Sequence, residues 1–224
     1  MEKSSKNKHV GKVGRTVAGV KIVLILTFYF FSIVSLKLFY IGKNSEGMPV
    51  AAKPRAEELV KIYSIVKSHR PDLDDTEVWK VSGVILDESL QHGMDPILIV
   101  ALIQIESGFR YQAVSPMGAR GIMQIMPHVA EALAREIGVA QNPEAKLFEP
   151  EHLDDPVFNI KLGVYYLNDL KKNFRNLNLA LSAYNIGPTK IRNRLENKIN
   201  FSEHYAAAVL GAYEKYKTEP HPAF

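Results

Sequence analysis

The sequence contains no cysteine and no recognisable metal-binding pattern, and these absences exclude several kinds of site. Without cysteine there can be no disulfide, no thiolate nucleophile and no Cys-ligated zinc. The seven histidines do not form a spacing such as H-E-x-x-H. We therefore expect no metal site and no cofactor, and interpret His128 and His152 as surface or helix-capping residues.

An excess of positive charge is also missing from most of the chain. Of the 28 basic and 24 acidic residues, six and one lie within residues 1–21, which leaves a net charge of −1 for the rest. A nucleic-acid-binding protein carries its positive patch on the folded domain. The distribution of charge therefore argues against nucleic acid as a partner.

Alternating patterns typical of strands are scarce, and no internal repeat or low-complexity tract is visible.

The segment Ile22–Ile41 is almost entirely apolar, and its twenty residues would span about 30 Å as a helix, the thickness of the hydrocarbon layer. The basic residues 1–21 before it predict a cytoplasmic tail and an exported domain. A cleaved signal peptide is the competing interpretation, with small residues at Val50–Ala52 available for cleavage.

We therefore predict four parts: a tail over 1–21, a transmembrane anchor over 22–41, a linker over 42–53 and an all-α domain over 54–218. Besides the central helix described next, the apolar spacing and the Pro, Gly and Asp signals predict helices at Pro54–Arg70, Thr76–His92, Pro127–Ile137, Asp155–Phe174, Leu177–Tyr184, Pro188–Glu196 and Phe201–Lys217.

The domain is organised around Asp95–Ser107, read as DPILIVALIQIES. A run that is apolar on every side cannot lie on a surface, and it is shorter than the roughly 20 residues needed to span a bilayer. Asp95 and Pro96 are typical of a helix start, and Gly108 of a helix end. The pattern predicts a short buried helix, with a buried strand as the alternative.

Glu106 stands at the end of this helix. Apolar surroundings and the negative end of the helix dipole both disfavour its charged form and raise its pKa, as a general acid near neutral pH requires. The alternative is an ordinary surface glutamate in a last helical turn. The nearby acids Asp87 and Glu88 are expected on the solvated face of the preceding helix.

Two further segments carry chemistry-bearing residues. The glycine-containing loop Ser115–Pro127, read as SPMGARGIMQIMP, is unusually apolar, so we expect it to pack on the core or to line a groove. Gln124 within it needs a hydrogen-bond partner. Tyr184 in Ala183–Asn185 offers a flat ring and a hydroxyl suited to sugars. A satisfied buried glutamine and an ordinary core tyrosine are the alternatives.

Taken together, Glu106-Ser107, Gly121–Gln124 and Ala183–Asn185 resemble the ES, GLMQ and AYN motifs of the soluble lytic transglycosylase family, in the same order. The resemblance covers about residues 90–215. It implies a lysozyme-like helical fold and action on peptidoglycan glycan strands. Ile122 departs from the usual Leu, and Thr189 from the usual small residue.

The resemblance also implies roles for single residues. Glu106 corresponds to a single catalytic acid and base. The expected substrate-binding residues are Ser115, Met123, Gln124, Met126, Tyr184, Asn185 and Tyr205, the last on the weakest match.

The implied reaction cleaves the β-1,4 bond between N-acetylmuramic acid and N-acetylglucosamine and forms a 1,6-anhydro ring. The alternatives are a lysozyme-type hydrolase and a non-catalytic wall-binding component of an envelope-spanning machine. The expected location is the inner membrane, crossed once, with the catalytic domain in the periplasm.

Overall fold

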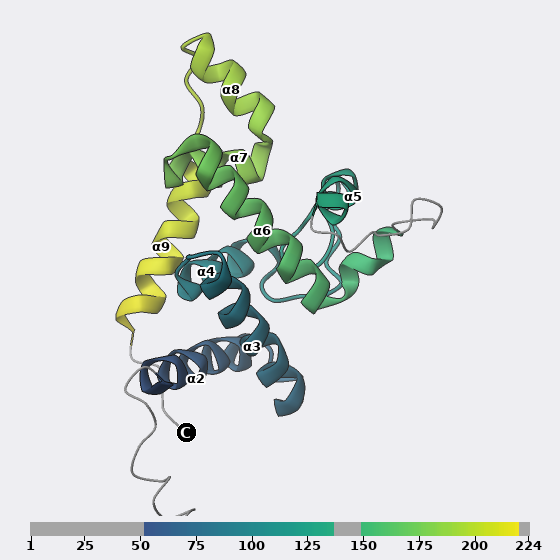
Figure 1. The fold of residues 1–224 in the computed structure, drawn as a ribbon, viewed down its shortest axis with the longest axis vertical. Coiled ribbons are helices and arrows are strands. Elements are labelled where there is room, and N and C mark those ends of the chain that lie inside the picture. Colours follow the sequence, from purple (N-terminus) through teal and green to yellow (C-terminus); the bar gives the residue numbers. More distant parts are fainter. Residues whose placement is uncertain (1–51, 137–148, 220–224) are drawn as a thin grey trace, which may run out of the picture. The chain divides into compact units, whose positions relative to one another are not determined.

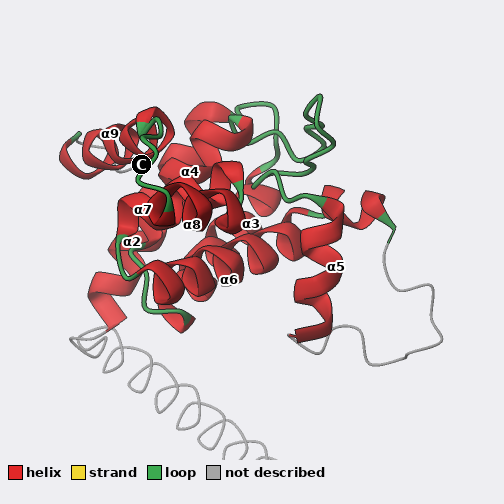
Figure 2. Cartoon of the chain, turned by 90° about the horizontal axis from the view of Figure 1, so that it is seen from above, coloured by secondary structure: helices red, strands yellow, loops and turns green. Residues whose placement is uncertain are grey.

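A computed structural model describes residues 52–136 and 149–219, and its regular structure is helical (Figures 1 and 2). No strand occurs in these ranges, where two isolated bridges join Arg120 to Val114 and to Ile125. The all-α prediction is confirmed for this part. The predicted tail, the predicted membrane segment Ile22–Ile41 and most of the predicted linker lie outside the described residues. Within the described ranges, no helix has both the length and the apolar character needed to cross a membrane.

Most helices follow one another along the chain with short connections; the exceptions are the loop between α4 and α5 and the stretch between α5 and η1, most of which lies outside the described residues. Their bounds are α2 Ala52–His69, α3 Asp75–Gln91, α4 Pro96–Ser107, α5 Pro127–Glu136, the 3-10 helix η1 Pro150–Asp154, α6 Pro156–Phe174, α7 Leu177–Ile186, α8 Pro188–Glu196 and α9 His204–Thr218.

The central helix α4 forms where the local signals predict it. The Asp95 side chain accepts a hydrogen bond from the Ile97 N–H, and Gly108 ends the helix in a left-handed conformation. Every residue from Pro96 to Ile103 is buried. The helix is not buried along its whole length, however, because Ile105 in its last turn is 38% exposed. The helix therefore brings its C-terminal turn, with Glu106, to the edge of the core.

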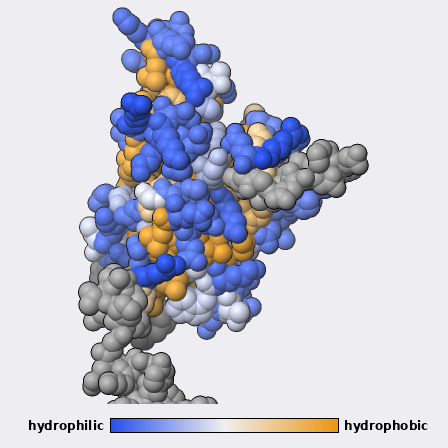
Figure 3. Space-filling model, viewed as in Figure 1, coloured by the Kyte–Doolittle hydropathy of each residue, from blue (hydrophilic) through white to orange (hydrophobic). Residues whose placement is uncertain are grey.

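Neighbouring helices enclose the buried part of α4. Helices α3 and α9 pack directly against it, and α6 packs against both α3 and α7 (Figure 1). The apolar side chains of these helices form one core cluster. The outer surface seen in Figure 3 is mostly hydrophilic, with smaller apolar areas between the polar ones.

Two helix ends and one short 3-10 helix differ from the sequence-based expectation. Helix α7 continues past Asn185 to Ile186, because Gly187 caps it with a φ of 94° and donates its N–H to the Ala183 carbonyl. Helix α9 begins at His204 rather than at Phe201. The 3-10 helix η1 was not predicted from the sequence.

Candidate active site

Glu106 is half-buried in the last turn of α4. Burial raises the pKa of its carboxyl from 4.5 to about 7, and a hydrogen bond from Tyr205 lowers it by a smaller amount. The Tyr205 hydroxyl donates this bond to Glu106 Oε1 from the first turn of α9. A carboxyl with this pKa is about half protonated at neutral pH, so it can both donate and accept a proton.

The next residue, Ser107, fixes the apolar loop against α4. Its buried hydroxyl donates to the Ile122 carbonyl at 2.7 Å. Ile122 is itself fully buried. The ES pair thus has two different tasks, because the carboxyl faces outward while the hydroxyl ties the loop to the helix.

Gln124 adopts a left-handed backbone with a φ of 52°. Its side-chain Nε2 donates to the Ala113 carbonyl at 2.9 Å and to the Gly121 carbonyl at 2.8 Å. Two carbonyl acceptors settle the orientation of the amide, because only its nitrogen can donate to them. The side-chain oxygen of Gln124 is therefore the atom that can accept a hydrogen bond from a ligand.

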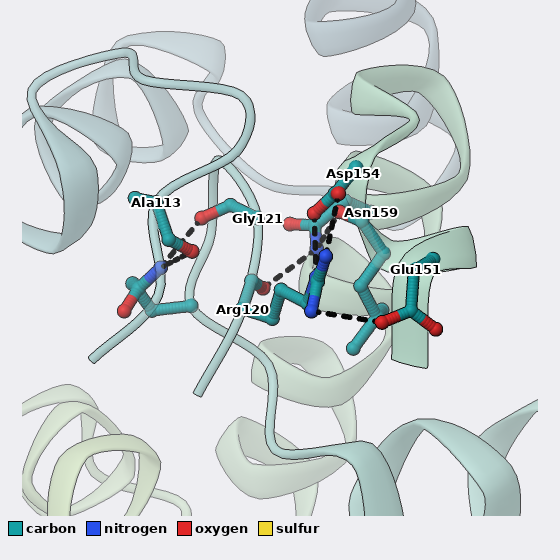
Figure 4. A network of polar contacts seen from close by, with 8 residues as sticks. Ala113, Arg120, Gly121, Glu151, Asp154 and Asn159 are labelled. Atoms are coloured by element: carbon teal, nitrogen blue, oxygen red, sulfur yellow. Dashed lines mark hydrogen bonds and ion pairs between the residues drawn. The ribbon is translucent and has the colours of Figure 1, made fainter. Parts of the chain in front are cut away.

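A polar network holds the outer side of this loop, as Figure 4 shows. The Arg120 guanidinium forms two hydrogen bonds with Asp154, at 2.7 and 2.8 Å, and an ion pair with Glu151 at 3.2 Å. Arg120 also holds the pKa of the Asp154 carboxyl below its usual value. Fully buried Asn159 donates to the Arg120 and Leu153 carbonyls, both at 3.0 Å. The loop is thereby tied to η1 and to α6.

Met123 lies inside the core and not in a groove. Its side chain is fully buried against Gly163 of α6, where an added Cβ would approach the Met123 sulfur to 2.5 Å. Its N–H donates to Asn159 at 2.7 Å, and its carbonyl accepts the Tyr184 hydroxyl at 2.9 Å. The Met123 side chain, predicted to bind substrate, thus lies in the core and is not among the residues that line the cavity described below.

Tyr184 is buried behind the site. Its hydroxyl donates a hydrogen bond to the Met123 carbonyl. Its ring packs on the Tyr166 ring, with 5.3 Å between the ring centres. Burial, and next the nearby Glu106 carboxyl, raise the pKa of Tyr184 well above its usual value. The Tyr184 hydroxyl is therefore neutral and close to Glu106. Its hydrogen bond to the loop determines its position.

A cavity of about 940 Å³ opens in front of Glu106. Its walls come mainly from the loop that follows α4. The lining residues are Arg70, Glu106, Arg110, Tyr111, Gln112, Ala113, Val114, Ser115, Pro116 and Gln124.

Three of the predicted site residues, Glu106, Ser115 and Gln124, line this cavity, and Tyr205 contacts Glu106 directly. The Ser115 hydroxyl accepts the Ala119 N–H at 3.0 Å, so it also shapes the turn. Two other predicted residues lie elsewhere. Met126 is half-buried but does not line the cavity, and Asn185 is exposed near the end of α7.

The two acids considered beside Glu106 do not reach the cavity. Asp87 is exposed and pairs with Arg55 at 2.5 Å, as expected of a solvated residue. The Glu88 side chain is only 15% exposed and lies 4.0 Å from Lys161, so its expected position on the solvated face was wrong. Glu106 is the only carboxyl among the lining residues. Within the described ranges, no cluster of three or more His, Asp or Glu could hold a metal ion.

Sequence reasoning missed Arg70, Arg110 and Tyr111 in the cavity wall. The Arg70 guanidinium lies 5.1 Å from the Tyr111 ring centre and donates to the Phe109 carbonyl at 2.8 Å. A cluster of aromatic and basic residues directly after the helix stop at Gly108 was the available signal. The contribution of Arg70, 36 positions before Glu106, had no local signal.

Comparison with known proteins gives a consistent picture. The family model described as Transglycosylase SLT domain matches residues 83–206. An inactive mutant of the lytic transglycosylase Slt from Pseudomonas aeruginosa is 30% identical, with a TM-score of 0.52 over 60% of this chain and 23% of that one. The 70-kDa soluble lytic transglycosylase from Escherichia coli is 29% identical, with a TM-score of 0.51 and the same coverage.

A complex of the 70-kDa soluble lytic transglycosylase with bulgecin A is 23% identical, with a TM-score of 0.55 over 75% of this chain and 31% of that one. At this identity the likeness concerns the fold alone. The chain spans only about a quarter of the length of the first two relatives, so the match concerns one part of those larger proteins.

Proposed function

Since the chain belongs to the transglycosylase SLT domain family, with its lysozyme-like helical fold, we propose that it cleaves peptidoglycan glycan strands as a lytic transglycosylase. The observation that carries this proposal is a single carboxyl at the wall of a large cavity. This carboxyl belongs to Glu106, and its pKa is about 7. The cleaved bond is the β-1,4 linkage between N-acetylmuramic acid and N-acetylglucosamine.

The chemistry follows from one carboxyl that changes its protonation state. Protonated Glu106 donates its proton to the glycosidic oxygen, and the C–O bond at the anomeric carbon breaks. The 2-acetamido carbonyl of the muramic residue stabilises the positive charge there, as in substrate-assisted glycosidases. The ionised Glu106 then takes the proton of the 6-hydroxyl, whose oxygen bonds to the anomeric carbon and closes the 1,6-anhydro ring.

The absence of a second carboxyl from the cavity lining favours this route over hydrolysis. A retaining or inverting hydrolase uses two carboxyl groups on either side of the bond. Here the attacking hydroxyl belongs to the substrate, so no second carboxylate is needed to activate a water molecule. Tyr205 holds Glu106 in place through its hydrogen bond.

The test is a digest of purified peptidoglycan by the full chain, analysed by mass spectrometry. We expect muropeptides that are lighter by one water than the hydrolytic product, and no such products from Glu106→Gln. Products with free reducing ends would instead identify a lysozyme-type hydrolase. Binding to the wall without any product would identify a non-catalytic component.

We further propose that Ile22–Ile41 anchors the protein once in the inner membrane, with the catalytic domain in the periplasm. The support is the sequence itself, in which six basic residues precede a twenty-residue apolar segment. Resistance of the protein to extraction from membranes at alkaline pH is the expected result. Release, with a mature N-terminus near Lys53, would identify a cleaved signal peptide.

A further inference from the structure

Two arginines line the cavity, and their surroundings differ. The Arg70 fork is already occupied, because its Nε and Nη2 donate to the Asp72 carboxylate at 2.9 and 2.7 Å. Its Nη1 donates to the Phe109 carbonyl. Asp72 thus neutralises Arg70, and this side chain forms a fixed part of the wall.

Arg110 has no such partner. Its Nε donates to the Ser107 carbonyl at 2.9 Å, at the C-terminal end of α4. Its two terminal nitrogens carry four N–H groups, which make no hydrogen bond or ion pair to any residue in the described ranges. The side chain is therefore anchored at its base, while its terminal nitrogens are available to a ligand.

A strained turn places Arg110 in the wall. Gly108 and Phe109 are both left-handed, with φ values of 58° and 63°. A non-glycine residue in this conformation is strained and persists only where its surroundings impose it. Phe109 is fully buried, stacks on His69 at 5.0 Å, and has its carbonyl held by Arg70. The end of α2 and the residue after it thus determine the direction of the chain at Arg110.

This part of the wall lies partly outside the family match. His69 and Arg70 precede residue 83, where the match begins. The cavity therefore has a basic side that includes Arg70, a residue outside the matched range. Glu106 is the only lining carboxyl and is half protonated at neutral pH, while Asp72 balances Arg70. Arg110 therefore leaves the cavity lining with a net positive charge.

We propose that Arg110 binds a carboxylate of the substrate, carried either by the lactyl arm of a muramic acid residue or by the peptide stem attached to that arm. The inference rests on the proposed function, since it takes the substrate to be peptidoglycan. The sugar rings themselves are uncharged, so the lactyl arm and its stem are where a strand offers carboxylates. The planar guanidinium matches a carboxylate with two parallel hydrogen bonds, which an ammonium cannot form.

The test measures binding in full-length protein in mild detergent, with Glu106→Gln as the background so that no ligand is cleaved. Three tetrasaccharides are titrated calorimetrically: GlcNAc–MurNAc units with stems, the same units with free lactyl groups, and chitotetraose, which has no carboxylate. We expect Arg110→Gln to weaken binding of one muramic ligand about tenfold and to leave chitotetraose unchanged. Arg110→Lys, which keeps the charge without the fork, is expected to recover part of the loss.

The matched control is Arg135→Gln, which removes one exposed positive charge from α5 outside the cavity lining. It should change none of the three affinities. A loss confined to the stem-bearing ligand assigns the carboxylate to the peptide, and a loss confined to the free lactyl ligand assigns it to the sugar. Equal losses for all three ligands, or none, would overturn the proposal.

Activity gives a second readout that separates binding from a structural effect. With Glu106 restored, Arg110→Gln should raise KM about tenfold and leave kcat and its pH profile unchanged. A displaced α4 end would alter kcat and the pH profile instead, and such a result would overturn the binding role. Because binding is measured in a cleavage-deficient background, failure to find 1,6-anhydro products would contradict the proposed function without deciding this inference.

Discussion

The Tyr205 hydroxyl donates a hydrogen bond to the Glu106 carboxylate across 99 positions of sequence, joining the first turn of α9 to the last turn of α4. It is the one hydrogen bond to the Glu106 side chain within the described ranges. It stabilises the ionised carboxylate and so opposes the effect of burial on the Glu106 pKa. The bond therefore adjusts the pH at which the acid loses its proton.

The first prediction concerns Tyr205→Phe, which removes this donor and keeps the ring. The pKa of Glu106 should rise further, because only burial then acts on it. Since the reaction begins from protonated Glu106, the alkaline limb of the kcat/KM profile should move to higher pH. The measurement is a pH series with purified glycan strands. An unchanged limb, or one at lower pH, would contradict the role given to Tyr205.

The control for this variant is Tyr213→Phe on the same helix. The Tyr213 hydroxyl donates to Asp95 at 2.6 Å, at the opposite end of α4 from Glu106. Its loss should lower the free energy of unfolding by about 1 kcal/mol or less, without moving the pH profile.

The second prediction concerns stability and pH through Glu106. Its folded-state pKa of about 7 lies above the usual 4.5, so the folded protein binds more protons than the unfolded chain between these values. The free energy of unfolding therefore falls as pH rises through this window, by about 3 kcal/mol. Glu106→Gln removes the effect, so its stability relative to wild type should increase by that amount between pH 4 and pH 8. Denaturant unfolding at both pH values measures it.

Asp154→Asn tests a carboxyl whose effect on the free energy of unfolding depends on pH in the opposite direction. Arg120 lowers the pKa of Asp154, so this carboxylate contributes stability above its unfolded pKa and loses it as pH falls through the folded value. The deficit of Asp154→Asn relative to wild type should be full at pH 7 and shrink in acid. If both variants showed the same pH trend, the surroundings assigned to Glu106 would be wrong.

The third prediction concerns Gly163 in α6. An added Cβ there would approach Met123 Sδ to 2.5 Å and its Cβ to 2.9 Å, in a fully buried region. Gly163→Ala should lower the free energy of unfolding by about 1–3 kcal/mol, because the core has no room for the methyl group. It should also lower turnover, since the Met123 carbonyl holds Tyr184. Thermal unfolding and glycan digestion measure the two effects.

A second helical glycine provides the matched control for Gly163. Gly83 in α3 has no atom within 4 Å of an added Cβ. Gly83→Ala should therefore stabilise the protein by about 0.5–1 kcal/mol through helix propensity alone. If the two substitutions had equal effects, the close contact between Gly163 and Met123 would not be the cause.

The fourth prediction concerns Tyr184→Phe, which leaves the Met123 carbonyl without its buried donor. The free energy of unfolding should fall by about 1–3 kcal/mol. The pH profile should keep its shape, because the Tyr184 hydroxyl bonds to the loop and not to Glu106. A shifted profile in this variant would mean that Tyr184 acts on the acid directly.

Local patterns were sufficient for the framework of the site. Asp95, Pro96 and Gly108 determine where α4 begins and ends, because capping and left-handed residues act within one helical turn. The apolar run between them required burial, so Glu106, which follows the run, was expected at the edge of the core. The motifs then indicated which glutamate and which loop belong together.

Local patterns could not decide which loop side chains face the cavity. Met123 and Gln124 are neighbours, and both were predicted to bind substrate. Met123 nevertheless enters the core, because Gly163 leaves space for its side chain on α6. Asn185 is a residue type that often ends a helix, but α7 continues past it and is capped by Gly187 two residues later. The position of Met123 therefore depends on packing between segments far apart in the chain, whereas the end of α7 is set by a local glycine cap.

The sequence alone determined an all-α domain, the helix that carries Glu106, and the family of motifs around it, because helix signals and motif spacing are local. Only the tertiary structure decided that Tyr205 bonds to Glu106, that Arg70 holds Phe109 in a left-handed turn, and that Arg110 keeps its terminal nitrogens available. These contacts join α2, α4 and α9, and their geometry exists only once the helices have packed on a common core.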